Sequence, residues 1–137
     1  MRLIVTIFAF FLTDSGYSQD LVSVANTFLN ERNYLEAKNA IDDALQKIEF
    51  TENPRAWYTK GRVYQEILKS DNASLDAFKT NRDEFVSEVV EAYNRTKALT
   101  SSGSNLFILS NNQLELLWYE GISQGVGFYE TSDFNAA

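Results

Sequence analysis

The sequence WYTKGRVY at residues 57–64 carries the clearest helical pattern in the chain. Its tryptophan, its glycine and its last tyrosine follow one another at intervals of four and three residues, which places them on one face of a helix. Asn53 and Pro54 stand just before this stretch, and proline is tolerated in the first turn of a helix but not deeper inside one. The sequence therefore predicts a helix over residues 56–69.

The same spacing continues on both sides of this helix. Apolar residues recur at intervals of three and four, for example along the stripe that runs from Leu35 to Ile48. No segment shows a convincing strand pattern, so we expect an all-α fold. A polar stretch over residues 70–81 and the sequence TSSGSN at residues 100–105 predict breaks between helices. The other expected helices cover residues 19–31, 34–48, 84–99 and 113–130.

Composition limits the fold to one globular domain and narrows the function. The 137 residues are 45% hydrophobic and 23% charged, a composition typical of a single folded unit. Twelve Lys and Arg stand against 19 Asp and Glu, for a net charge of −7, so we expect no nucleic-acid partner. The chain has no Cys and no His. This excludes thiol and imidazole catalysis and Cys/His zinc sites, and we expect a binding protein without catalytic residues, cofactor or metal.

The N-terminal residues have the composition of a targeting segment. Met1 and Arg2 supply a positive start, residues 3–12 (LIVTIFAFFL) are apolar, and small polar residues continue to Ser18. This order predicts a secretory signal peptide over residues 1–18, cleaved after Ser18. A membrane span needs about 20 apolar residues, twice the length of this run. We expect an exported protein, periplasmic or secreted, with no transmembrane span in the mature chain.

Two sets of residues near the two ends of the chain repeat one spacing. In each set, successive members are separated by 3, 6 and 3 positions. The spacing indicates an internal repeat. The sets are Ala25, Phe28, Tyr34 and Ala37, and Gly125, Phe128, Phe134 and Ala137.

Trp57, Gly61 and Tyr64 fit the W-x2-L-G-x2-Y signature of the tetratricopeptide repeat, with Lys60 in place of the leucine. With the two repeated sets, the chain resembles that family. The resemblance implies antiparallel helical hairpins stacked as a short superhelical array, with repeats over about residues 19–49, 54–99 and 113–137. It also implies small residues where the two helices of a hairpin cross, namely Ala25, Gly61 and Gly125, with Ala37 and Ala44 on the facing helix. Helical spacing favours core positions for the aromatic residues Phe28, Tyr34, Trp57, Tyr64 and Tyr93.

The middle repeat is longer than the 34 residues of the family, and two registers account for this. In one, residues near 70–83 are inserted and Val89 takes the place of a small alanine. In the other, Ala73 and Phe78 begin the second helix without an insertion. The last repeat stops at Ala137 without its second helix. We therefore expect that the chain is the N-terminal piece of a longer protein, or that a partner covers its open end.

The resemblance implies a protein-binding scaffold of the cell envelope or extracellular space, whose first helices line a concave groove. An extended peptide is the partner that amide, guanidinium and phenol groups in this groove would suit. Two alternatives stay open: an exported carbohydrate or nutrient binder, motivated by the 14% aromatic content, and a docking segment of a larger protein whose activity lies beyond Ala137. The candidate groove residues are Asn26, Asn30, Tyr58, Arg62, Gln65, Ile122 and Tyr129.

Overall fold

The computed structural model describes the backbone of residues 18–131 and the side chains of residues 21–121. Within this range the chain is helical and contains no strand, which confirms the all-α prediction. The predicted signal peptide, apart from Ser18, lies outside the described residues, and so do Phe134 and Ala137. The elements are α1 (Ser18–Asn30), α2 (Tyr34–Leu45), α3 (Ile48–Thr51), α4 (Pro54–Lys69), the 3-10 helix η2 (Ala73–Leu75), α5 (Asp76–Thr80), α6 (Arg82–Ala98) and α7 (Asn105–Thr131).

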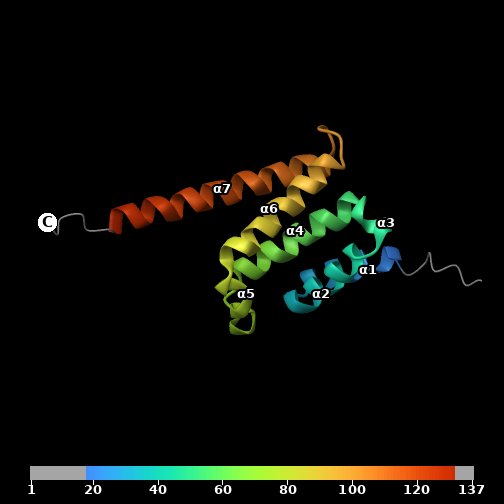
Figure 1. The fold of residues 1–137 in the computed structure, drawn as a ribbon, viewed down its shortest axis with the longest axis horizontal. Coiled ribbons are helices and arrows are strands. Elements are labelled where there is room, and N and C mark those ends of the chain that lie inside the picture. Colours follow the sequence, from blue (N-terminus) through green and yellow to red (C-terminus); the bar gives the residue numbers. More distant parts are fainter. Residues whose placement is uncertain (1–17, 132–137) are drawn as a thin grey trace, which may run out of the picture.

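Helix α4 occupies the centre of the molecule. Each long helix packs against the next one along the chain: α1 on α2, α2 on α4, α4 on α6 and α6 on α7. Helix α4 also contacts α1 on one side and α7 on another. Figure 1 shows α7 running along α6 and extending beyond the body of the molecule. Helix α4 therefore contacts each of the other four long helices.

Local signals explain where several helices begin and end. The Asn53 side chain caps α4 by accepting a hydrogen bond from the Arg55 backbone N–H at 3.0 Å, and Pro54 occupies the first helical position. Helix α1 ends in a Schellman motif, in which the backbone N–H of Asn33 donates to the Phe28 carbonyl. Arg32 takes the left-handed conformation that this motif requires, with φ 62°. This turn sends α2 back along α1.

Two helix boundaries differ from the predicted ones by three residues or more. Helix α2 ends at Leu45, and the chain turns before the short helix α3, so Ile48 is 87% exposed and does not continue the buried stripe. Helix α7 begins at Asn105, eight residues earlier than predicted. Its start is explained by Ser104, whose hydroxyl oxygen accepts a hydrogen bond from the Phe107 backbone N–H at 3.2 Å.

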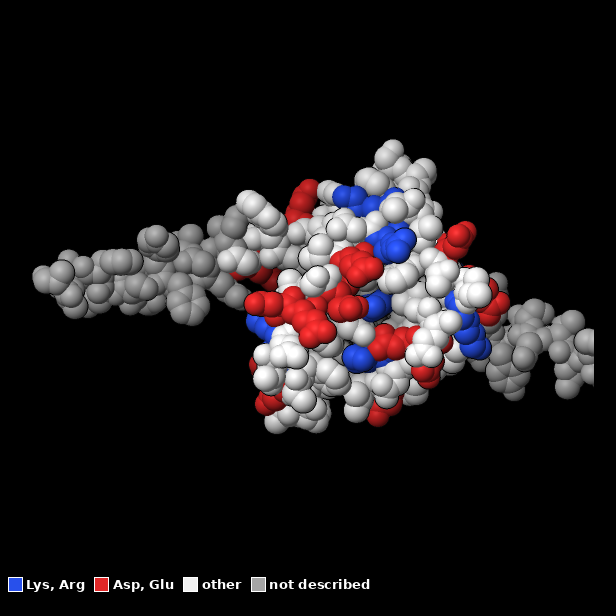
Figure 2. Space-filling model, in the orientation of Figure 1, with Lys and Arg blue, Asp and Glu red and all other residues white. Residues whose placement is uncertain are grey.

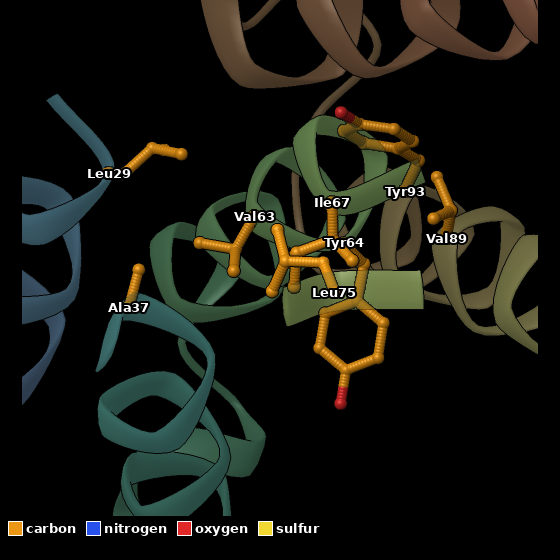
Figure 3. Packing of buried hydrophobic residues seen from close by; sticks show 8 residues of the cluster. All are labelled: Leu29, Ala37, Val63, Tyr64, Ile67, Leu75, Val89 and Tyr93. Carbon is orange, nitrogen blue, oxygen red and sulfur yellow. The ribbon is translucent and has the colours of Figure 1, made fainter. Parts of the chain in front are cut away.

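The buried apolar side chains form two clusters. One joins α1 and α2 to α3 and the start of α4, and the other joins α4 to α6, with contributions from α1, α2 and the 3-10 helix (Figure 3). The first contains Val22, Ala25, Ile41, Ala44, Phe50 and Ala56. The second contains Leu29, Ala37, Val63, Tyr64, Ile67, Leu75, Val89 and Tyr93.

The aromatic residues expected in the core differ in how deeply they lie. Tyr64 and Tyr93 are buried, and Phe28 and Tyr34 are half-buried against the second cluster. Trp57 is half-buried outside both clusters, and its indole N–H donates to the Thr51 carbonyl at 2.9 Å. Trp57 therefore ties α4 to the end of α3 instead of filling the core.

The segment between α4 and α6, where the sequence predicts a break between helices, forms η2 and α5 and packs against the core. Leu75 is buried in the second cluster, and Phe78 lies half-buried against it. Asn72 starts the 3-10 helix, since its side-chain oxygen accepts a hydrogen bond from the Ser74 backbone N–H at 3.0 Å. These contacts hold α5 beside α4 and α6.

Gly61 of α4 lies directly against the ring of Tyr93 of α6. A β-carbon at Gly61 would lie 2.7 Å from the Cε1 atom of the Tyr93 ring, well inside van der Waals contact. The three predicted small alanines Ala25, Ala37 and Ala44 are also fully buried. Gly61 is thus required by the side chain opposite it.

Candidate functional site

Two of the candidate groove residues bind other helices of the same chain. The Asn26 amide donates to the Thr59 hydroxyl at 3.0 Å and to the Val22 carbonyl at 2.9 Å, which links α1 to α4. Gln65 is 3% exposed and accepts a hydrogen bond from the Tyr93 hydroxyl at 2.7 Å. Gln65 therefore does not face solvent, contrary to the expectation from sequence, because its side chain is hydrogen-bonded to Tyr93 of α6.

The remaining candidates differ in their surroundings. Asn30 is exposed at the end of α1, whereas Tyr58 and Arg62 are half-buried on α4. The Tyr58 ring lies 5.9 Å from the Tyr93 ring, centroid to centroid. Ile122 and Tyr129 belong to α7, as do Gly125 and Phe128, but only the backbone is described at these four positions.

Arg62 lies on the side of α4 between the contacts of this helix with α1 and α7. At 100° per residue it is about 60° from Thr59, which bonds to α1, and about 20° from Lys69, which lies 3.8 Å from Glu120 of α7. None of the ion pairs among the described side chains involves Arg62. We call Tyr58 and Arg62 of α4, together with Asn30 at the end of α1, the α4 face.

A different part of the molecule is hollowed. A depression of about 510 Å³ lies between α2, α4, α5 and α6. Its apolar part consists of three aromatic rings: Phe85 stacks on Tyr64 at 4.6 Å between centroids, and Phe78 is tilted against Phe85 at 5.5 Å. The sequence does not reveal this depression. Phe78 and Phe85 are seven residues apart, a spacing that a single helix would place on one face, but they lie on α5 and α6.

Ion pairs line the rest of the depression. Lys38 binds Asp42 at 2.7 Å, and Lys60 binds Glu88. Both ammonium groups also lie over the Tyr64 ring, 5.3 and 5.1 Å from its centre. On the face of the molecule seen in Figure 2, acidic and basic side chains are interspersed over the middle of the molecule, where α4 and α6 lie.

Tyr64 is held as a hydrogen-bond donor at the edge of this depression. Its hydroxyl donates to the Asp42 carboxylate at 2.9 Å. Burial and the neighbouring Asp42 charge raise the pKa of Tyr64 well above its usual range. Asp42 thus accepts from both a phenol and an ammonium group, an arrangement suited to fixing side-chain positions. Among the described residues, no three Asp or Glu side chains are placed to share a metal ion.

The residues that sequence analysis missed include an exposed apolar row on α7. Ile108, Leu109, Leu116 and Tyr119 project from this helix and are between 43% and 71% exposed. The first two were missed because the predicted helix began only at residue 113. We call these four residues the α7 stripe.

Comparisons of the chain with protein-family models, with curated proteins and with solved structures found no match. Within residues 18–131, no helix combines the length and apolar character needed to cross a membrane.

Proposed function

We propose that this chain is an exported, non-catalytic protein-binding scaffold, periplasmic or secreted, made of hairpins similar to tetratricopeptide repeats. In this proposal an extended protein segment binds along the α4 face. The observation that carries it is the position of Arg62, a half-buried residue of α4 between α1 and α7 that none of the described ion pairs engages.

The helix contacts support a repeat architecture. Helices α1 and α2 form one packed pair, and α4 and α6 form the next. The first helices of the successive pairs touch each other, α1 with α4 and α4 with α7. The contact of Gly61 with Tyr93 supplies the close crossing that the family signature implies. Such stacking gives a continuous surface on the first helices, where a partner can contact several repeats at once.

The chemistry of the α4 face suits a polypeptide. A guanidinium group donates hydrogen bonds to backbone carbonyls and binds carboxylates through two parallel bonds. The Tyr58 ring offers an apolar surface and a hydroxyl group beside it. Asn30, at the exposed end of α1, adds an amide that can donate and accept.

Cross-linking capture with the full chain tests this proposal. The chain is incubated with cell-envelope or culture-fluid proteins, and bound proteins are identified by mass spectrometry. We expect specific partners for the natural chain and their loss from the double variant Tyr58→Ala, Arg62→Ala. A matched control removes one exposed aromatic residue and one exposed arginine outside both proposed surfaces, Trp118→Ala with Arg82→Ala. Equal capture by the α4-face variant refutes the proposal, and loss only in the control moves the binding site to α7.

The aromatic depression favours a second candidate, a binder of carbohydrates or small nutrients. Its rings and flanking carboxylate and ammonium groups are the kinds of group that hold a sugar by stacking and hydrogen bonding. Trp57 reports on the site, because the Lys60 ammonium that lines the depression lies 5.6 Å from the Trp57 ring centre. We expect glycan binding to change tryptophan fluorescence, and an unchanged spectrum across a glycan panel removes this candidate.

A further inference from the structure

The α7 stripe is an apolar helix face that nothing in the described structure covers. Around the helix axis, at 100° per residue, its four side chains fall within an arc of about 100°, in which the exposed Asn112 also lies. Along the axis they span about 17 Å, from Ile108 to Tyr119. Isolated exposed apolar residues are ordinary on a protein surface. A row of four on one helix face is a pattern found in helices that pack against a partner.

The other face of α7 is already used. Leu114 and Leu117 pack against the second core cluster, and Ser110 is completely buried. On the helix these three residues lie opposite the α7 stripe. Helix α7 therefore has two apolar faces, of which α4 and α6 cover one.

The charges beside the α7 stripe are acidic. Glu115 borders it on one side and Glu120 on the other. Residues 105–131 contain no Lys and no Arg. Glu115 accepts a hydrogen bond from the Asn111 amide, and Glu120 lies 3.8 Å from Lys69 in an exposed ion pair. A pair of this kind contributes little because solvent screens it, so both borders keep their negative character.

We propose that the α7 stripe docks an amphipathic helix from another protein, with an apolar face bordered by Lys or Arg on both sides. Such a helix buries the exposed side chains, and its cations meet Glu115 and Glu120. A second copy of this chain is a poorer occupant, because it would bring glutamates against glutamates with no cation on either α7. An anionic membrane is also a poorer occupant, because it would meet a chain of net charge −7.

Two synthetic peptides of about 18 residues test the proposal directly, since that length covers the stripe. Both carry the same leucine stripe at helical spacing; one has Lys at the flanking positions and the other Glu. Fluorescence anisotropy of the labelled peptides, titrated with the full chain at low salt, measures binding. We expect the Lys peptide to bind at least about tenfold more tightly than the Glu peptide. Equal affinity for the two peptides, or no binding of the Lys peptide, overturns the proposal.

Matched variants locate the binding surface. Leu116→Asp places a charge in the stripe, whereas Leu35→Asp makes the same change at a leucine of similar exposure on α2. We expect the first to weaken Lys-peptide binding at least about tenfold and the second to leave it unchanged. Circular dichroism melting confirms that both variants fold. Equal loss in both variants overturns the assignment to α7.

Three further measurements distinguish the proposed partner helix from the other occupants, and the α7 stripe from the α4 face. A concentration-dependent dimer in sedimentation that Leu116→Asp abolishes would make a second copy the occupant and overturn the proposal. Tighter binding to phosphatidylcholine vesicles than to the Lys peptide would overturn it in favour of a membrane. The double variant Tyr58→Ala, Arg62→Ala should bind the Lys peptide normally, because the α4 face and the α7 stripe are different surfaces. Loss of peptide binding in that variant would contradict the assignment to α7.

Discussion

Replacing Gly61 by alanine should destabilise the protein, although the same change in an exposed helix is stabilising. A β-carbon at this position would lie 2.7 Å from Cε1, 2.9 Å from Cζ and 3.0 Å from Cδ1 of the Tyr93 ring. Ordinary contact begins near 3.4 Å, so the ring or the helix must move by about 0.7 Å, the difference between 3.4 and 2.7. Tyr93 is fully buried and its hydroxyl is bonded to Gln65, so the ring has little freedom to move.

The expected size follows from two opposing terms. Overpacking a well-packed core costs about 1–3 kcal/mol, and the close contact with a rigid ring places Gly61→Ala near the upper end of that range. Alanine has a helix propensity about 1 kcal/mol better than that of glycine. The net result is a decrease of about 1–2 kcal/mol in the free energy of unfolding. Urea unfolding followed by circular dichroism at 222 nm measures it.

Gly121 provides the matched control. It lies in α7, and a β-carbon there would meet nothing within 4 Å. Gly121→Ala should therefore leave the stability unchanged or raise it by up to about 1 kcal/mol. A second variant, Tyr93→Leu, removes the ring; combined with Gly61→Ala, it should show a favourable coupling energy. If Gly61→Ala is as stable as the natural chain while Gly121→Ala behaves as expected, the close contact of α4 with α6 is not formed as described.

Three further outcomes are expected. Tyr93→Phe should lower the free energy of unfolding by about 1–3 kcal/mol, because the buried Gln65 oxygen loses its donor. Tyr119→Phe, at an exposed ring, should leave the free energy of unfolding unchanged. Equal effects of the two variants would argue against the buried hydrogen bond. Stability should be constant between about pH 7 and about pH 9 and fall above about pH 10, because burial raises the pKa values of Tyr64 and Tyr93 and the unfolded chain releases these protons first. Urea unfolding midpoints across this range, measured for the natural chain and for Tyr64→Phe, give the change of stability with pH. An identical change in the variant would contradict the role of the Tyr64 phenol. Arg32→Gly should raise the melting temperature by a few degrees, because glycine adopts the φ of 62° without strain. A lower melting temperature would show that the unfolded-state entropy of glycine outweighs the relief of backbone strain.

Local sequence signals predicted the helices well where a helix supplies its own cap. The Asn53-Pro54 pair identified the start of α4 within two residues, because capping involves only neighbouring positions. Ser104 gives a similar capping signal for α7. The helix was nevertheless predicted to begin only at residue 113, because the apolar run LFIL at residues 106–109 has no clear helical period. Ile48 was placed on a buried stripe because periodicity does not show where a chain turns.

The candidate site was only partly accessible to sequence reasoning. Helical spacing placed Arg62 away from the packing face of α4, and the structure leaves this side chain half-buried between α1 and α7. The same reasoning placed Gln65 on the open surface, because a polar residue on a helix is usually exposed. The hydroxyl group that binds it belongs to Tyr93, 28 residues further along the chain. No local pattern contains that information.

The sequence by itself determined the all-α class, the apolar faces of the main helices, the acidic surface and the absence of thiol and imidazole chemistry. These properties depend on composition and on neighbours three or four positions apart. Only the tertiary structure decided that Gly61 meets Tyr93, that Asn26 meets Thr59, and that α7 has one covered and one open apolar face. The physical reason is that contacts between helices depend on where each helix ends and how the next one crosses it, and a one-residue change in a boundary turns a helix face by about 100°.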